Sequence, residues 1–270
     1  MKQVQAVIFD LAGTVVDFGS FAPTTIFVEA FRRGFDFDIT LAEARVPMGL
    51  GKWDHIKAVG ELPEVAARWQ SQFNRAMTIT DIDTIYRTFM PLQIAKVADH
   101  AELIPQTERV VSELRSQLIK IGACTGYPRA VLDALLPALT ANGFTPDCIL
   151  ATDDLAAGGR PGPYMALKNV IELCIDDVKT CVKIDDSVPG IMEGKNAGMW
   201  TVALLLSGNE AGMTLAQYEK ADLTTLKKVR QRAQEAFQAS KPDYMIDTIA
   251  DLPRVIHEIN GRLLQGERPS

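Results

Sequence analysis

A short apolar segment that ends in an acid constrains the fold of this 270-residue chain more than any other feature. Residues 4–9 read VQAVIF, which is short for a buried helix and typical of a buried β-strand. Asp10 ends the segment, and Gly13 then allows the chain to turn. The pattern predicts a carboxylate at the carboxyl end of a parallel strand, where open α/β sheets bind their ligands. Such an acid can act as a nucleophile or hold a metal ion.

The rest of the chain alternates between strand and helix signals, apart from one helical block. Residues from about 22 to 98 carry only helical signals, with helices expected around 26–31, from 51, after 63 and over 81–95. Strands are expected at 119–124, 148–151, 181–184, 200–206 and 244–246. Helical stretches separate most of these strands, which is typical of βαβ crossovers that build a parallel sheet.

The expected fold class is therefore α/β, a doubly wound parallel sheet with an inserted helical cap domain. The core domain is predicted over residues 1–20 and 99–262, and the cap domain over residues 21–98. Residues 263–270 are expected to form a tail. An insertion directly after the first strand would cover the carboxyl ends of the strands.

The composition of the chain argues against nucleic acid and membrane as partners. The chain is 47% hydrophobic and 23% charged, as in ordinary globular proteins, and its formal net charge of −6 argues against a nucleic-acid surface. The four cysteines form no C-x-x-C pair, and without a signal peptide we expect no disulfides. No apolar run approaches the ~18 residues that indicate a membrane span. We expect a cytoplasmic protein that acts on a small molecule, with neither nucleic acid nor membrane as a partner.

Three further polar groups follow predicted strands. Thr125-Gly126, followed by Tyr127, joins a hydroxyl and a glycine amide to a predicted helix start, which suits an anion, although an ordinary helix cap is the alternative. The guanidinium of Arg160 can grip a phosphate with two hydrogen bonds, or it is simply solvated. The adjacent acids Asp185 and Asp186 would repel each other if they were buried without a cation, so they suggest a site for an ion such as Mg²⁺. The alternative is that the two acids form a surface turn.

In this order, the motifs around Asp10, Thr125-Gly126, Arg160 and Asp185-Asp186 resemble those of the haloacid dehalogenase superfamily over nearly the whole chain. The resemblance implies an Mg²⁺ ion held by Asp10, Ala12, Asp185 and Asp186. Superfamily members that hydrolyse phosphate monoesters carry an acid at the position of Ala12, which donates a proton to the leaving group. Ala12 offers only its backbone carbonyl. Related sequences often carry Gly-Asp in the last motif and an acid four residues on, where this chain has Gly190.

Residues 48–55, 17–23 and 196–202 resemble the phosphonatase family of the superfamily. The resemblance implies hydrolysis of the phosphorus–carbon bond of phosphonoacetaldehyde to acetaldehyde and phosphate. It assigns Lys52 to a Schiff base with the substrate aldehyde, and it implies a homodimer formed through the cap. Met48, Lys52 and His55 would share one helical face if the helix extends back to Met48. His55 either shuttles protons or packs in the cap.

Other implied contacts to the phosphonate come from Thr125, Gly126, Tyr127, Met48 and Arg160. A helix that begins near Gly51 would place Lys52 in its first turn, where the helix dipole disfavours the ammonium form. Burial under the cap would act in the same direction. Two alternatives stay open from the sequence: another hydrolase of the superfamily, and a non-catalytic member of the fold.

Overall fold

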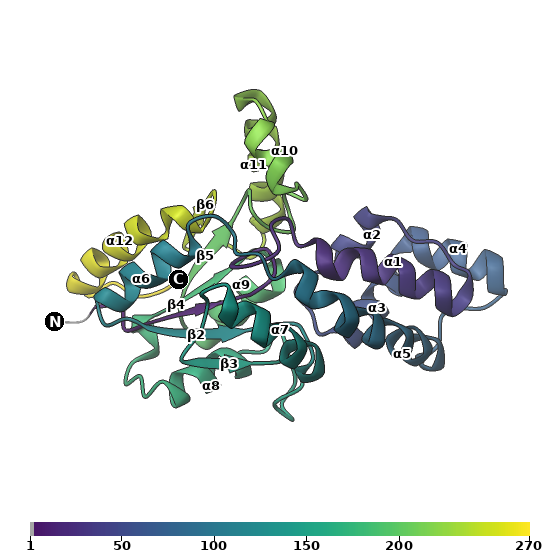
Figure 1. Cartoon of the computed structure of the whole chain (residues 1–270), viewed down its shortest axis with the longest axis horizontal. Coiled ribbons are helices and arrows are strands. Elements are labelled where there is room, and N and C mark those ends of the chain that lie inside the picture. The colour runs from purple at the N-terminus through teal and green to yellow at the C-terminus, as the bar shows by residue number, and fades with distance from the viewer. Residues whose placement is uncertain (1–2) are drawn as a thin grey trace.

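A six-stranded parallel sheet forms the centre of the computed structural model, which describes residues 3–270 (Figure 1). The strand order is β3-β2-β1-β4-β5-β6. The strands are β1 (Ala6–Phe9), β2 (Lys120–Cys124), β3 (Cys148–Leu150), β4 (Cys181–Asp185), β5 (Trp200–Leu204) and β6 (Tyr244–Ile246). Phe9 is in register with Ala123 and Ile184, so the central strands end at the same edge. The predicted fold class is confirmed.

Helices cover both faces of the sheet. One face packs against α6 (Thr107–Ser116), α7 (Arg129–Ala141) and α12 (Leu252–Leu264). The other packs against α8 (Tyr164–Glu172), α9 (Val188–Ala197) and α11 (Leu223–Phe237). Successive residues of β1 alternate between these faces, with Val7 and Phe9 on the first and Ala6 and Ile8 on the second. Because both faces are buried, the strand is apolar at every position.

The remaining short elements connect these layers. They are α10 (Leu215–Lys220) and the 3₁₀ helices η1 (Val97–His100), η2 (Val178–Thr180) and η3 (Ile249–Asp251). Together with α11, α10 projects from the sheet (Figure 1). No helix within residues 3–270 is both long and apolar enough to cross a lipid bilayer.

Residues 21–96, which lie between β1 and α6, form a separate helical body, the cap. It contains α1 (Phe21–Phe35), α2 (Leu41–Arg45), α3 (Lys52–Glu61), α4 (Pro63–Phe73) and α5 (Ile79–Lys96). Aromatic side chains form its own apolar core, chiefly Phe27, Phe31, Trp69 and Phe89. The helices expected at α1, α3, α4 and α5 are confirmed. The five-residue α2 was not predicted, because it is too short to show a helical period.

The loop that leads into α3 lies directly on the core. A methyl group at position 126 would lie 2.8 Å from the carbonyl oxygen of Leu50 and 3.1 Å from that of Gly49. These distances are too short for a carbon–oxygen contact, so Gly126 is the residue that lets the cap loop approach. The domain boundaries at residues 20 and 98 remain a proposal.

Two segments connect the cap to the core, and a polar pair joins them. Asp17, in the first segment, accepts a hydrogen bond at 2.8 Å from the backbone N–H of Ala22 at the start of α1. His100, in the second segment, lies 3.3 Å from the other carboxylate oxygen of Asp17. The hydrogen bond to Asp17 raises the pKa of His100, although partial burial opposes this effect.

The raised pKa of His100 predicts a pH-dependent contribution to stability. The pair stabilises the fold fully below the unfolded pKa of about 6.5, and this stabilisation is lost as the pH rises through the raised folded pKa. His100→Ala should therefore lower the free energy of unfolding by up to about 1 kcal/mol near pH 5.5, since the pair is partly exposed. Urea denaturation should show a smaller loss near pH 9.

His257, which is exposed on α12, provides a matched control. His257→Ala removes an exposed side chain and should change the free energy of unfolding little near pH 5.5. Equal losses for His100→Ala at both pH values would contradict the pairing with Asp17.

Candidate active site

A small pocket lies at the carboxyl edge of the sheet, under the cap. It is lined by Asp10, Ala12, Ser20, Pro23, Met48, Gly49, Lys52, Thr125, Gly126, Tyr127, Arg160, Asp186 and Ser187. All the residues predicted for the site line this pocket, except His55 and Asp185. The pocket has a volume of about 20 Å³, which is room for about one water molecule. This arrangement of cap and core is therefore a closed state.

Three buried carboxylates meet at the base of the site. Asp10, Asp185 and Asp186 each place an oxygen within 4.8 Å of the others. Burial, followed by the charge of Asp185, raises the pKa of Asp10 to about 6. Burial and the charges of Asp10 and Asp185 raise the pKa of Asp186 well above its usual value. A hard divalent cation such as Mg²⁺ fits this all-oxygen group, because it would relieve the mutual repulsion of the acids.

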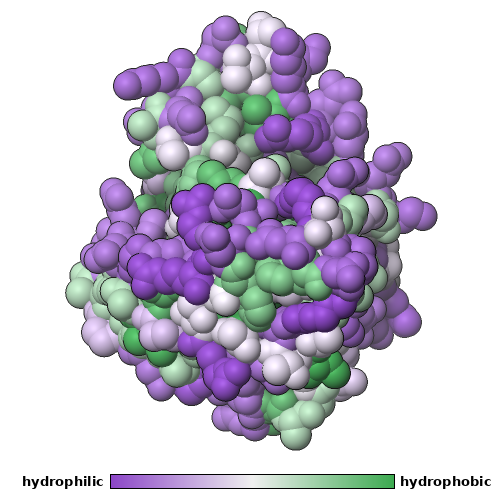
Figure 2. Space-filling view, turned by 90° about the vertical axis from the view of Figure 1, so that its right-hand side faces the viewer, coloured by the Kyte–Doolittle hydropathy of each residue, from purple (hydrophilic) through white to green (hydrophobic). Residues whose placement is uncertain are grey.

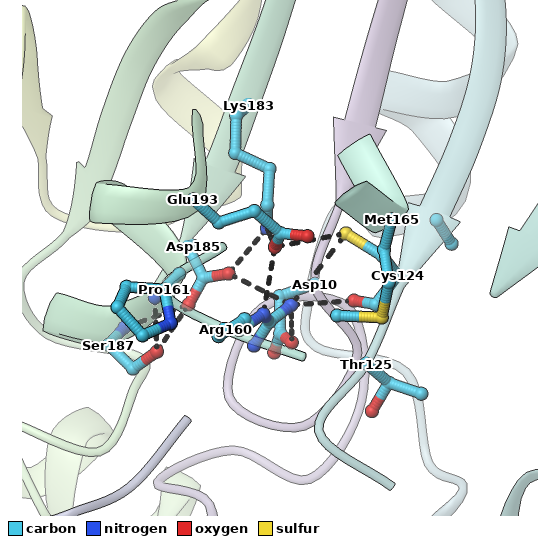
Figure 3. Close-up of polar contacts among 12 residues, drawn as sticks. Asp10, Cys124, Thr125, Arg160, Pro161, Met165, Lys183, Asp185, Ser187 and Glu193 are labelled. Atoms are coloured by element: carbon cyan, nitrogen blue, oxygen red, sulfur yellow. Dashed lines mark hydrogen bonds and ion pairs between the residues drawn. The ribbon is translucent and has the colours of Figure 1, made fainter. Parts of the chain in front are cut away.

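Arg160 lies in the middle of these acids (Figure 3). Its Nη2 lies 2.8 Å from Asp10 Oδ1 and donates a hydrogen bond at 2.7 Å to the carbonyl oxygen of Cys124. Its Nε donates to Glu193 Oε2 at 2.8 Å. Burial alone would lower the pKa of Arg160, but the surrounding carboxylates outweigh it and raise the pKa. The guanidinium is therefore a fixed cation beside Asp10.

Asp185 does not line the pocket, and its carboxylate is hydrogen-bonded to neighbouring residues. Its Oδ1 accepts from the N–H and the hydroxyl of Ser187, at 3.0 and 2.7 Å, and its Oδ2 accepts from Lys183. Burial would raise the pKa of Asp185, but Arg160 and Lys183 outweigh it and lower the pKa. Because both oxygens have protein donors, this geometry favours Asp186 for direct contact with a metal ion.

Gly190 explains where the Asp185 carboxylate fits. A methyl group at position 190 would lie 1.9 Å from Asp185 Oδ2, so any side chain there would occupy the same space. A side chain at position 190 and the carboxylate of Asp185 therefore exclude each other in this arrangement.

Lys52 enters the pocket from the first position of α3, with Gly51 as the N-cap. Its Nζ lies 5.0 Å from the ring centroid of Tyr127 and 5.7 Å from that of Phe27. Burial, with a smaller effect from Arg160, lowers the pKa of Lys52 to about 8, although Asp10 opposes this shift. A useful fraction of the amine is therefore uncharged near neutral pH.

Met48 does not belong to that helix. It lies in the turn before α3, so the condition for Met48, Lys52 and His55 to share one helical face is not met, and the expected helix start near Gly51 is confirmed. The turn nevertheless brings Met48 to the pocket wall beside Lys52. Because Lys52 is the first residue of α3, its amine lies near the positively charged end of the helix dipole.

His55 lies one turn behind Lys52, outside the pocket lining. Its ring stacks on Phe27 at 3.8 Å, and its Nε2 is 2.8 Å from the carbonyl oxygen of Ala44. Since a carbonyl only accepts, Nε2 carries the proton, and Nδ1 has no hydrogen-bond partner within residues 3–270. Burial and the neighbouring Lys52 keep the pKa of His55 well below its usual value. The ring is neutral, and its role as a proton shuttle stays a prediction.

Thr125 and Gly126 form the opposite wall, just before α7. Thr125 Oγ1 accepts a hydrogen bond at 3.1 Å from the backbone N–H of Tyr127, which leaves the hydroxyl proton free to donate into the pocket. Pro128 is the N-cap of α7, so the helix start predicted after Tyr127 is confirmed. A hydroxyl and backbone N–H groups at a helix start are suited to a phosphoryl group.

Two charged residues of the site were missed from the sequence. Lys183, in β4, and Glu193, in α9, are completely buried behind Arg160. A signal for Lys183 existed, since a lysine two residues before Asp185 in a buried strand points to the same face as that acid. Glu193 gave no comparable signal, because its partner Arg160 lies 33 residues away in the sequence.

These features define a hydrolase of the haloacid dehalogenase type. The family model for haloacid dehalogenase-like hydrolases matches residues 4–198, and the chain belongs to this family. Phosphonoacetaldehyde hydrolases are among its relatives. Those of Vibrio cholerae serotype O1 and Psychromonas ingrahamii are 66% and 64% identical over 98% of this chain, covering 98% and 90% of their own lengths.

A solved structure supports the same relationship. The phosphonoacetaldehyde hydrolase-like protein from Oleispira antarctica is 39% identical and superposes with a TM-score of 0.95, covering 98% of this chain and 96% of the other. The resemblance to the phosphonatase family is thus confirmed.

The acid cluster predicts a specific metal-binding defect. Asp186→Asn removes one charge from the group that faces the pocket, so Mg²⁺ should bind roughly tenfold more weakly or worse. Isothermal titration calorimetry measures this affinity without any substrate. Asp176→Asn changes an exposed acid before the amino end of β4 and should leave the affinity unchanged. Undiminished Mg²⁺ binding in Asp186→Asn would remove this residue from the proposed ligands.

Proposed function

We propose that this chain hydrolyses phosphonoacetaldehyde to acetaldehyde and phosphate, cleaving the phosphorus–carbon bond. The observation that carries the proposal is the buried Lys52, with its lowered pKa, in the same small pocket as Asp10 and Arg160. An amine suits an aldehyde, and the carboxylate and guanidinium suit a phosphoryl group. The substrate named for the curated relatives carries both of these groups.

In the proposed first stage, the neutral amine of Lys52 attacks the aldehyde carbon of the substrate. Loss of water gives a protonated imine, which withdraws electrons from the neighbouring carbon. Asp10 then attacks phosphorus in line. The phosphorus–carbon bond breaks, its electron pair moves into the imine to give an enamine, and an aspartyl phosphate remains on Asp10.

In the second stage, water hydrolyses the aspartyl phosphate and releases phosphate. The enamine takes a proton at carbon, and hydrolysis of the resulting imine frees acetaldehyde and Lys52. This route explains how Ala12 is compatible with catalysis. The electron-withdrawing imine activates the leaving carbon, so no acid is needed at position 12.

The phosphoryl oxygens are proposed to bind Thr125, Gly126 and Arg160, which line the pocket. Asp10, Asp186 and the carbonyl of Ala12 would hold Mg²⁺, with Asp185 behind them or as a further ligand. When bound, the ion would offset the charge of the acids and of the phosphoryl oxygens.

We further propose that the enzyme is a cytoplasmic homodimer that takes part in phosphonate degradation. Free thiols at all four cysteines suit a reducing compartment. Figure 2 looks onto the cap end of the molecule, where hydrophobic patches interrupt a mostly hydrophilic face. Leu41 and Val46, in and beside α2, are exposed apolar side chains that contact between two caps would cover. Sedimentation velocity tests the oligomeric state.

The proposed activity is tested by measuring phosphate release from phosphonoacetaldehyde and from p-nitrophenyl phosphate, with and without Mg²⁺. We expect rapid, Mg²⁺-dependent release from the phosphonate and little from the ester, since Ala12 supplies no acid to an alkoxide. Asp10→Asn is the control and should abolish turnover. Faster release from the ester would favour another hydrolase of the superfamily.

The role of Lys52 has a separate test. Lys52→Arg keeps a positive charge but cannot form the imine, so kcat should fall by several orders of magnitude. Borohydride added with substrate should label Lys52 in the unmodified enzyme, and peptide mapping locates the label. Lys57→Arg changes a nearby α3 lysine that does not line the pocket, and it should retain both activity and labelling. Unlabelled Lys52 in an active enzyme would eliminate the imine step.

A further inference from the structure

Behind the phosphoryl-binding wall lies a second layer of buried charge that the proposed mechanism does not use. Lys183 and Glu193 are fully buried and lie 3.8 Å apart, between Nζ and Oε2 (Figure 3). Neither residue lines the pocket. Glu193 reaches from α9 toward the Nε side of Arg160, and Lys183 reaches from β4 toward Asp185.

We propose that Glu193 and Lys183 are positioning residues that fix the Arg160 guanidinium in the orientation that binds the phosphoryl group. This inference rests on the proposed function only for the identity of the substrate. Glu193 holds the Nε edge of the guanidinium, while the carbonyl of Cys124 and Asp10 hold Nη2. Two edges fixed in this way determine the plane of the group and the direction of its remaining Nη1.

The remaining nitrogen of the guanidinium, Nη1 of Arg160, is available to donate a hydrogen bond to a ligand. No hydrogen bond within residues 3–270 involves Arg160 Nη1, and Arg160 lines the pocket. A guanidinium without its Nε partner could rotate about its last bonds toward the acids around it. The partner at Nε therefore keeps Nη1 available to a phosphoryl oxygen.

Lys183 acts on the other side of the same network. It donates to Asp185 Oδ2, which lies 3.3 Å from Arg160 Nη2. With Lys183 in place, Asp185 is shared between two cations and does not draw the guanidinium away from Asp10. Arg160 and Lys183 thus offset part of the negative charge of the four acids Asp10, Asp185, Asp186 and Glu193, and the charge that remains suits a divalent metal ion.

Stability does not explain an acid at position 193. Glu193 Oε1 is buried and has no hydrogen-bond partner within residues 3–270, which costs free energy. Buried ion networks are often no more stabilising than apolar side chains of similar volume. The contact from Glu193 to Arg160 is thus better explained by orientation of the guanidinium.

Binding of inorganic phosphate in the presence of Mg²⁺ tests the proposal directly. In Glu193→Gln, which keeps the shape of the side chain, the dissociation constant of phosphate and the KM for phosphonoacetaldehyde should both rise roughly tenfold. Borohydride labelling of Lys52 with acetaldehyde, which has no phosphoryl group, should be unchanged. Lys183→Met should likewise weaken phosphate binding and leave the labelling of Lys52 unchanged. A merely structural role would lower both together.

A double-mutant cycle shows whether Glu193 acts through Arg160. In an Arg160→Lys background the Nε contact is absent, so Glu193→Gln should cause no further loss of phosphate affinity. Thr180→Val is the matched control, since it removes a partly buried hydrogen bond from the Thr180 hydroxyl to the Asp177 carbonyl, at the opposite end of β4. It should lower the unfolding midpoint while phosphate affinity stays the same.

Three results would overturn the inference: unchanged phosphate affinity in Glu193→Gln, full additivity with Arg160→Lys, or no phosphate binding by the unmodified enzyme. Glu193→Ala serves as the second variant if the glutamine variant does not fold. The experiments distinguish a failure of this inference from a failure of the proposed function. An enzyme that binds phosphate through this network but releases none from phosphonoacetaldehyde would refute only the proposed function.

Discussion

The buried charge cluster at the carboxyl edge of the sheet is the constraint on which the rest of the structure depends. Acids buried together are stable only when cations lie among them, and Arg160 and Lys183 supply these cations from within the core. The parallel register of β1, β2 and β4 makes the cluster possible, because it ends three strands at one level. The scaffold thus fixes a dense group of charges before any ligand arrives.

The cap contributes a single amine, that of Lys52, which loses its proton more readily than an exposed lysine does. The cap has its own aromatic core, separate from that of the sheet, and Lys52 stands at the first position of one of its helices. In the closed state the pocket is too small for an organic phosphonate, so substrate entry requires the cap to separate from the core. Closure then returns Lys52 to a dry environment, which lowers the pKa of its amine.

Much of this fold follows from the sequence, because buried parallel strands and amphipathic helices leave periodic patterns. The strand ends carrying Asp10, Thr125 and Asp186 were foreseeable for the same reason. Contacts between distant segments were not. The approach of Leu50 to Gly126 and the pairing of Arg160 with Glu193 depend on packing that no local pattern encodes. The placement of His55 against Ala44 likewise depends on the cap's tertiary structure.

The shared space of Asp185 and Gly190 links two sequence positions in evolution. Moving the carboxylate from the strand to the helix requires both residues to change, because one change alone either crowds two side chains together or removes the carboxylate to which Lys183 donates. Each single step is therefore expected to be less fit than either end point.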